Sequence, residues 1–171
     1  GMMVSFIQSN YKGFGSGVVV PSMGISLQDR AAGFSLEAGH PNEAAGGKRP
    51  RHTIIPGFLT RNGQPIGPFG VMGGEMQPQG HLQVVRALVD HGLGPQAVLD
   101  RPRWRWERGV EVHVEPGLDP VLAEALSGLG HQVVADSDSL AFGRGQMILR
   151  LDNGAYAAGS EPRADGAALG Y

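Results

Sequence analysis

Short runs of apolar residues, several of them alternating with polar ones, predict a series of strands along the chain. In residues 3–9, Val4 and Phe6 alternate with Ser5, which is the spacing of a strand with one buried face. Further extended segments are expected at residues 18–20, 24–27, 53–60, 66–72, 110–114, 132–135, 146–151 and 155–158. The pattern therefore predicts many short strands.

Fewer segments show the 3.6-residue spacing of helices. Leu82, Val85 and Val89 share one face of a helix expected over residues 78–91, and a shorter helix is expected over 95–99. A third helix is expected to begin after Asp119, a good N-cap residue. The buried face of this helix is predicted to consist of Leu122, Ala125, Leu126 and Leu129.

Turn signals indicate how these elements are connected. Asn62-Gly63 predicts a tight hairpin between the strands on either side, and Asp152-Asn153-Gly154 predicts another. Residues 38–52 show no periodicity and are expected to form a long loop. Because hairpins pair strands antiparallel, helices packed on such sheets give an α+β domain. We expect residues 1–171 to form a single domain of antiparallel sheets layered with helices.

Composition narrows the possible partners. The net charge of −2 gives no electrostatic reason to expect binding to nucleic acid or to an anionic membrane. No segment approaches the ~20 apolar residues of a membrane span. The chain has no cysteine, so disulfides and thiolate metal sites are excluded. The sequence does not distinguish between a cytoplasmic and a periplasmic location.

The clearest candidate for chemistry is Gly73-Gly74, where an apolar run ends shortly before the first long helix. Paired glycines at such a point let backbone N–H groups face a cavity, because no Cβ blocks the approach. Such a nest can hold the oxyanion of an acyl-transfer intermediate. The same residues can equally form a simple tight turn.

Other groups of residues could form binding sites, but each also has a simple structural explanation. The six histidines show no close ligand spacing, and no phosphate-binding loop with its lysine is present, so we expect neither a metal nor another cofactor. Trp104 and Trp106 among arginines could stack on bases, although a packed edge is favoured. The basic loop at residues 46–53 could hold a carboxylate or could simply be solvated.

Taken together, several short motifs resemble the small subunit of γ-glutamyltranspeptidases, which are N-terminal nucleophile hydrolases. The motifs occur in the family's order over nearly the whole chain: Asn10 with residues 14–21 and 24–27, Pro-Asn at 41–42, Gly-Lys-Arg-Pro at 47–50, Gly-Val-Met-Gly-Gly at 70–74, Arg-Pro-Arg-Trp at 101–104, Glu-Pro-Arg at 161–163 with Asp-Gly at 165–166, and Gly-Tyr at 170–171. The resemblance implies an αββα sandwich, of which this chain holds an incomplete part.

The resemblance also implies roles for particular residues. Gly73 and Gly74 fall where the family forms its oxyanion hole, and Asn10, Arg30, His52 and Thr53 are implied to line the acyl pocket. The family's nucleophile is a threonine released by self-cleavage, expected about ten residues before Gly1. The implied substrate is a γ-glutamyl or related amide, and the implied partner is the large subunit of the precursor.

Departures from the family pattern affect the acyl pocket. Where the family holds the substrate's α-amino group with Glu or Gln and with Asp, this chain has Arg30 and Gly33. His52-Thr53 stands in place of a Ser-Ser pair, and Gln8 in place of a second active-site threonine. These exchanges resemble the divergent branch of transpeptidase-like and cephalosporin-acylase-like proteins.

These implications lead to two expectations and one alternative. No Thr-Thr-His occurs in the sequence, so the chain alone is expected to be an inactive fragment of an amidohydrolase or acyltransferase. The alternative is a non-catalytic remnant or binding domain of the same fold. Strand edges and apolar helix faces that would meet the large subunit are expected to make the chain self-associate, most simply as a dimer.

Overall fold

The computed structural model describes residues 1–170, and the chain folds as two compact units. The larger unit contains Gly1–Ser5 and Ile55–Tyr171, and the smaller unit contains Phe6–Ile54. We describe each unit by itself.

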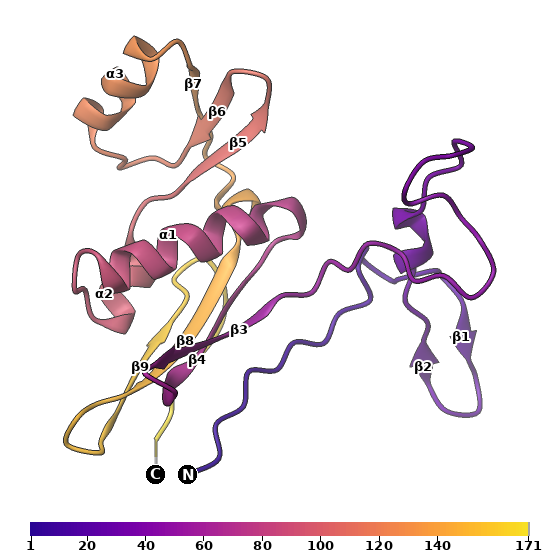
Figure 1. The fold of residues 1–171 in the computed structure, drawn as a ribbon, viewed down its shortest axis with the longest axis horizontal. Coiled ribbons are helices and arrows are strands. Elements are labelled where there is room, and N and C mark those ends of the chain that lie inside the picture. The colour runs from indigo at the N-terminus through magenta and orange to yellow at the C-terminus, as the bar shows by residue number, and fades with distance from the viewer. Residues whose placement is uncertain (171) are drawn as a thin grey trace. The chain divides into compact units, whose positions relative to one another are not determined.

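A four-stranded antiparallel sheet forms the centre of the larger unit. Its strand order is β3 (Pro56–Arg61), β4 (Gln64–Met72), β8 (Arg144–Arg150) and β9 (Tyr156–Ser160). Helix α1 (Gln77–Val89) packs on β4, while α2 (Pro95–Asp100) packs on β8 and β9. Figure 1 shows α1 running across the sheet with α2 beside its C-terminal end.

The core lies between this sheet and the two helices. Along β8, Met147 and Leu149 are buried while Ile148 between them is exposed, so the strand has one inward face. Burying each such side chain contributes about 1.5–3 kcal/mol. The core cluster consists of Phe69, Val71, Val84, Ala87, Val98, Leu99, Met147 and Leu149.

A second, three-stranded sheet belongs to the same unit. Strand β5 (Trp104–Arg108) pairs antiparallel with β6 (Glu111–Val114), and β6 pairs parallel with β7 (Gln132–Ala135). Helix α3 (Pro120–Gly128) makes the crossover that a parallel pair requires. The side chain of Asp119 accepts a hydrogen bond from the Val121 N–H at 2.9 Å and caps this helix as predicted.

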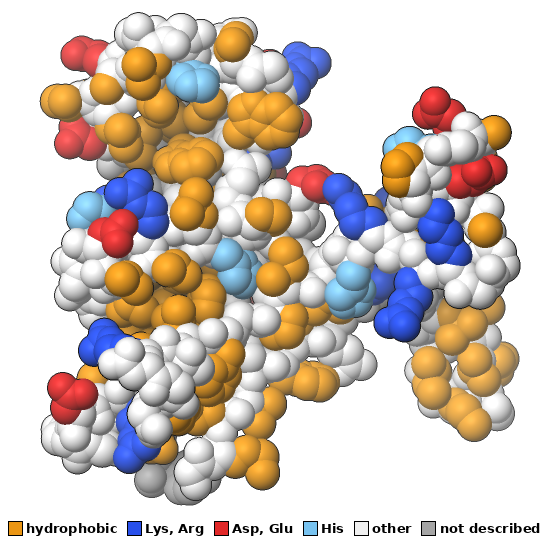
Figure 2. All heavy atoms as spheres, viewed as in Figure 1, with side chains coloured by type: hydrophobic (Ala, Val, Ile, Leu, Met, Phe, Trp, Pro, Cys, Tyr) orange, Lys and Arg blue, Asp and Glu red, His pale blue; other side chains and the backbone are white. Residues whose placement is uncertain are grey.

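The smaller unit contains little regular structure. A two-stranded hairpin of β1 (Val19–Val20) and β2 (Ile25–Ser26) is followed by a short 3-10 helix, η1 (Arg30–Gly33). Phe14 and Met23 lie exposed around the hairpin, where hydrophobic side chains gather in Figure 2. Residues 38–52 form the long loop that the sequence predicts.

Most predicted elements are confirmed, including both predicted hairpins and all three helices. The strand expected over residues 3–9 is wrong: residues 1–10 form no strand within the described chain. Val4 is exposed, and alternation alone does not make a strand without a neighbouring strand to accept its hydrogen bonds. Strand β5 was not predicted, although Trp104 and Trp106 alternate with charged residues as strand residues do.

The predicted helix faces need a further correction. In α1 the buried apolar residues are Val84 and Ala87, whereas Leu82 and Val89 are more than half exposed. In α3 no residue is buried within the described chain, so the predicted buried face of that helix is not covered by residues 1–170. The periodicity predicted both helices correctly. It did not predict which face of each helix is buried among residues 1–170.

The α+β class with antiparallel sheets is confirmed. The single-domain assignment for residues 1–171 stays a prediction. Among residues 1–170, no helix has both the length and the apolarity needed to span a bilayer.

The three-stranded sheet carries a histidine between two carboxylates, which predicts a pH-dependent stability. His113 donates from Nε2 to Glu111 at 2.9 Å and from Nδ1 to Asp136 at 3.0 Å. These hydrogen bonds, first that of Glu111, raise the pKa of His113 above its ordinary value of about 6.5. The stabilisation is therefore complete below the ordinary pKa and is lost as pH rises through the raised one.

The pKa values of both carboxylates are lowered, Glu111 by its bonds with His113 and Arg108, and Asp136 by the Asp138 N–H and by His113. Their contribution is present above their ordinary pKa values and is lost in acid. We expect His113→Gln to destabilise the natural protein most at about pH 5–6 and less near pH 8. Urea unfolding over this range tests it, with exposed His91→Gln as control. A difference that does not change with pH would contradict the prediction.

Candidate active site

The Gly73-Gly74 pair lies at the turn between β4 and α1. Gly73 has φ +150° and Gly74 φ +58°, which are backbone conformations that other residues rarely adopt. Gly74 begins a short 3-10 helix, η2 (Gly74–Met76), which leads directly into α1. The glycines are therefore required by the conformation of the turn itself.

Gly74 is the first residue of η2, so its N–H has no acceptor within that helical segment, and the residue is exposed. A Cβ built on Gly74 would meet no atom within 4 Å, so the space beside this residue is open. An exposed, unpaired N–H at the first turn of a helical segment can donate to an anion. This position fits an oxyanion donor, and it fits a simple tight turn as well.

A second glycine-containing segment, residues 142–145, packs against the Gly73 turn. A Cβ on Gly73 would lie 3.0 Å from the Cα of Gly143, and a Cβ on Gly143 would lie 2.8 Å from the carbonyl oxygen of Met72. The two backbones are thus in direct contact. The shape of the Gly73 turn depends on where the segment 142–145 is held.

Arg103 holds that segment. Its Nη1 donates to the carbonyl oxygens of Phe142 at 3.0 Å and Gly143 at 2.8 Å, and its Nη2 donates to Glu161 Oε2 at 2.8 Å. The same Glu161 oxygen accepts the N–H of Gly145 at 2.5 Å. One ion pair therefore binds both ends of the short segment that contacts Gly73.

Two further charged residues, Arg163 and Glu115, are bonded to this ion pair. Arg163 donates from Nη1 to Glu161 Oε1 at 2.5 Å and from Nε to Glu115 Oε1 at 2.6 Å. Glu115 Oε2 accepts the backbone N–H of Arg103 at 2.7 Å. We call Arg103, Glu115, Glu161 and Arg163 the four-charge cluster. With two cations and two anions, the cluster has no net charge.

Burial shapes the electrostatics of the four-charge cluster. The side chains of Arg103 and Glu161 are 2% and 0% exposed. Desolvation lowers the pKa of Arg103, and the neighbouring carboxylate of Glu161 acts in the opposite direction. Pairing therefore offsets a large part of the desolvation cost, and loss of either partner would leave a buried charge poorly compensated.

A cavity of about 410 Å³ opens beside Gly73. Arg105, Trp106 and Leu140 lie on its walls, so it offers both charged and apolar contacts. Gln79 of α1 fixes one wall, because its side chain accepts the Trp106 N–H at 2.7 Å and donates to the Trp106 carbonyl at 3.2 Å. The turn thus faces a space large enough for part of a small molecule.

The implied acyl-pocket residues lie in the smaller unit, where the structure brings three of them together. Arg30 is 9% exposed and donates to the Thr53 hydroxyl and, at 2.7 Å, to the carbonyl oxygen of Ser9. The carbonyl of the adjacent Asn10 accepts the N–H of Asp29 at 3.2 Å. Arg30 also lies 5.7 Å from the ring of Tyr11. A largely buried cation therefore contacts Thr53 and Tyr11, and Asn10 lies next to its third partner, Ser9.

His52 is not drawn into this arrangement by any described contact of its side chain, which is exposed. Lys48 of the same loop donates to the Pro41 carbonyl at 2.7 Å, and Arg49 is exposed. Gly73 and Gly74 belong to the larger unit. The site roles of these glycines and of Asn10, Arg30, His52 and Thr53 stay predictions.

The supporting residues were not identified from sequence. Arg103 and Arg163 each stand in a Pro-Arg motif, and no local pattern links two motifs so far apart in the chain. The glycines around Phe142 were the available signal for a close backbone approach. Among residues 1–170, no cluster of three or more His, Asp or Glu side chains is arranged to hold a metal ion.

Comparison with known proteins gives one consistent result. The family model described as Gamma-glutamyltranspeptidase matches residues 1–171. The chain is 38% identical to the glutathione hydrolase-like YwrD proenzyme of Bacillus subtilis, covering 99% of this chain and 34% of that protein. It is also 38% identical to the oxamate amidohydrolase proenzyme of Klebsiella pneumoniae, covering 100% and 34%. The chain spans about a third of the length of these curated relatives.

Solved structures agree in fold. Cephalosporin acylase from Bacillus halodurans superposes with a TM-score of 0.90 at 56% identity, covering 96% of this chain and 32% of that one. Gamma-glutamyltranspeptidase from Pseudomonas nitroreducens superposes with a TM-score of 0.83 at 24% identity, covering 98% and 93%. At that identity, the second match supports the fold alone.

The four-charge cluster predicts a large effect on stability. We expect Arg103→Met in the natural protein to lower the free energy of unfolding by about 3–5 kcal/mol, because Glu161 keeps its charge but loses a buried partner. Urea unfolding measures it. Arg86→Met is the matched control, since the exposed Arg86–Asp90 pair is expected to contribute at most about 1 kcal/mol. Equal losses in the two variants would contradict the prediction.

Proposed function

The chain belongs to the γ-glutamyltranspeptidase family, whose members are amidohydrolases and transpeptidases, and on this premise we propose that it forms the oxyanion-binding part of an amide-cleaving enzyme. The observation that carries the proposal is the position of Gly74, an exposed residue whose N–H begins a helical segment at the end of β4. Gly73 and Gly74 are assigned to the oxyanion hole, and Asn10, Arg30, His52 and Thr53 to the acyl pocket.

The nucleophile is proposed to come from outside this chain. The two threonines in residues 1–171 are Thr53 and Thr60, and neither belongs to a Thr-Thr-His sequence. The curated relatives are named proenzymes, and the chain spans about a third of their length. A threonine and a large-subunit partner from the remainder of a precursor are consistent with this, and residues 1–171 alone are then inactive.

The proposed reaction proceeds in two acyl-transfer steps. The threonine oxygen attacks the amide carbonyl carbon, its proton passes to the threonine's own α-amine, and the carbonyl oxygen becomes an oxyanion. The N–H groups at Gly73 and Gly74 donate to that oxyanion. When the intermediate collapses, the C–N bond breaks and the amine leaves with the proton. Water or an acceptor amine then attacks the acyl-enzyme and releases the acid or a new amide.

The acyl pocket is proposed to accept amides that carry a carboxylate and no ammonium group. Arg30 brings a positive charge to the place where the family holds an ammonium, and Gly33 offers no side chain there. The Klebsiella relative is named an oxamate amidohydrolase, and oxamate has an amide and a carboxylate but no ammonium. The Bacillus halodurans relative is named a cephalosporin acylase.

A single-atom change tests the role of Gly74. Replacing residue 74 of the natural protein by glycolic acid exchanges the backbone N–H for an ester oxygen and keeps the shape of the turn. We expect kcat for hydrolysis of a glutaryl anilide to fall by about 10²–10³, because one oxyanion donor is lost, with little change in KM.

The matched control places the same ester at Gly92, which lies three residues after the end of α1 and far in sequence from the turn. That variant is expected to keep its kcat within about threefold. If both esters behave alike, Gly74 is not an oxyanion donor. A natural protein with no amide-cleaving activity would favour the non-catalytic alternative.

Substrate selectivity tests the acyl pocket. We expect the natural protein to prefer a γ-glutamyl anilide over a glutaryl anilide by less than about tenfold, since these differ only in the ammonium group. The double variant Arg30→Gln with Gly33→Asp restores a carboxylate, and a Cβ at residue 33 has room because its nearest neighbour, the Arg51 carbonyl oxygen, lies 3.8 Å away. This variant should raise the preference by about ten- to hundredfold.

Arg30→Gln with Gly33→Asn is the control, because it matches the first variant in size and lacks its negative charge. The ratio of kcat/KM values for the two anilides is compared, so a loss of folded protein cancels. A wild-type preference above a hundredfold would show that another group binds the ammonium. An unchanged ratio in the Asp variant would exclude residue 33 from the pocket.

A further inference from the structure

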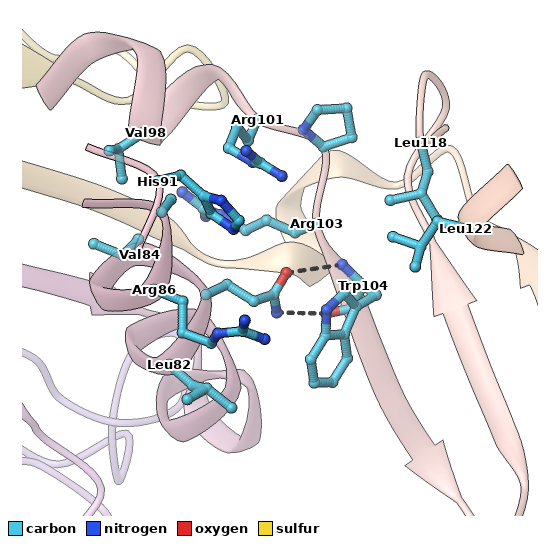
Figure 3. A pocket seen from close by; sticks show the side chains of 13 residues that line it. Leu82, Val84, Arg86, His91, Val98, Arg101, Arg103, Trp104, Leu118 and Leu122 are labelled. Carbon is cyan, nitrogen blue, oxygen red and sulfur yellow. Dashed lines mark hydrogen bonds between the residues drawn. The ribbon is translucent and has the colours of Figure 1, made fainter. Parts of the chain in front are cut away.

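A second cavity, of about 310 Å³, lies in the larger unit between α1, the connection from α2 to β5, and the start of α3. Figure 3 shows its lining, in which Leu82, Leu118 and Leu122 are the apolar side chains that remain at least partly exposed. This volume is at the lower end of the range for small-molecule sites, about 300–1,000 Å³. None of its lining residues is a candidate for the amide-cleaving site.

The charged side chains that line the cavity are all arginines, and His91 lies beside them. Arg86, His91 and Arg101 line it, and no carboxylate is among the lining residues. Arg86 uses its Nε to pair with Asp90 at 2.9 Å. Among residues 1–170, neither the guanidinium of Arg101 nor the imidazole of His91 has a hydrogen bond or an ion pair. The cavity therefore offers unused donors beside apolar walls.

One wall of the cavity is fixed before any ligand binds. The side chain of Gln83 donates to the Trp104 carbonyl at 2.9 Å and accepts the Trp104 N–H at 3.1 Å, as the dashed lines in Figure 3 show. These bonds tie α1 to β5. Behind them, Arg103 is locked in the four-charge cluster. A preformed wall reduces the conformational entropy that the protein loses when a ligand binds.

We propose that this cavity binds a small organic carboxylate with an aliphatic chain, whose chain lies against Leu118 and Leu122 and whose carboxylate pairs with Arg101. A planar guanidinium fits a carboxylate with two parallel hydrogen bonds. The apolar wall and the cationic rim together select an anion that also has an apolar body. This site is separate from the proposed amide-cleaving site and does not depend on it.

Calorimetric titration of the natural protein with octanoate, below its micellar concentration, tests the proposal. Octanoate is expected to bind with one site, while acetate and octanol bind at least tenfold more weakly, because each lacks one half of the recognition. Arg101→Met should weaken octanoate binding by about ten- to hundredfold. Arg108→Met is the matched control, since Arg108 is 81% exposed outside the cavity, and its affinity should not change.

A second variant guards against misfolding. Leu122→Asn keeps the charge of the protein and should weaken octanoate but not acetate, and far-ultraviolet circular dichroism checks that each variant is folded. The proposal is overturned if octanol binds as tightly as octanoate, if Arg101→Met binds like the wild type, or if octanoate gives no heat of binding. Because the readout is binding, a failure of amide cleavage leaves this result unaffected.

Discussion

Burial of four charges in one place is the constraint on which the larger unit depends. Arg103 and Glu161 are almost completely removed from water, so each must keep its partner or carry an uncompensated desolvation cost. Their hydrogen bonds end on backbone atoms of Phe142, Gly143 and Gly145. The geometry of a glycine turn far away in sequence is thereby fixed by an electrostatic requirement.

Local patterns identified the elements that carry local information. Asn62-Gly63 predicted its hairpin because both residues adopt the positive φ of the turn, at +52° and +76°. Asp119 predicted the start of a helix because its side chain caps a nearby N–H. Such signals depend on a few adjacent residues, so they can be recognised from the sequence without knowledge of the tertiary structure.

Non-local features were not readable in the same way. Residues 3–9 alternate like a strand, but no described strand pairs with them. Leu82 and Val89 occupy a helical stripe, although α1 buries the neighbouring stripe of Val84 and Ala87 against the sheet. In the candidate site, sequence identified Gly73 and Gly74, while the cluster that supports them joins residues up to 58 positions apart.

The connection between Arg103 and Glu161 also has a consequence for the order of folding. Synthesis proceeds from the N-terminus, so Arg103 and the segment 142–145 leave the ribosome before Glu161 and Arg163. Until those last residues arrive, the guanidinium of Arg103 has no buried counter-ion in Glu161 and favours water. The Gly73 turn is therefore completed late, and an intermediate stalled before residue 161 would display a nearly formed sheet with an unfinished oxyanion turn.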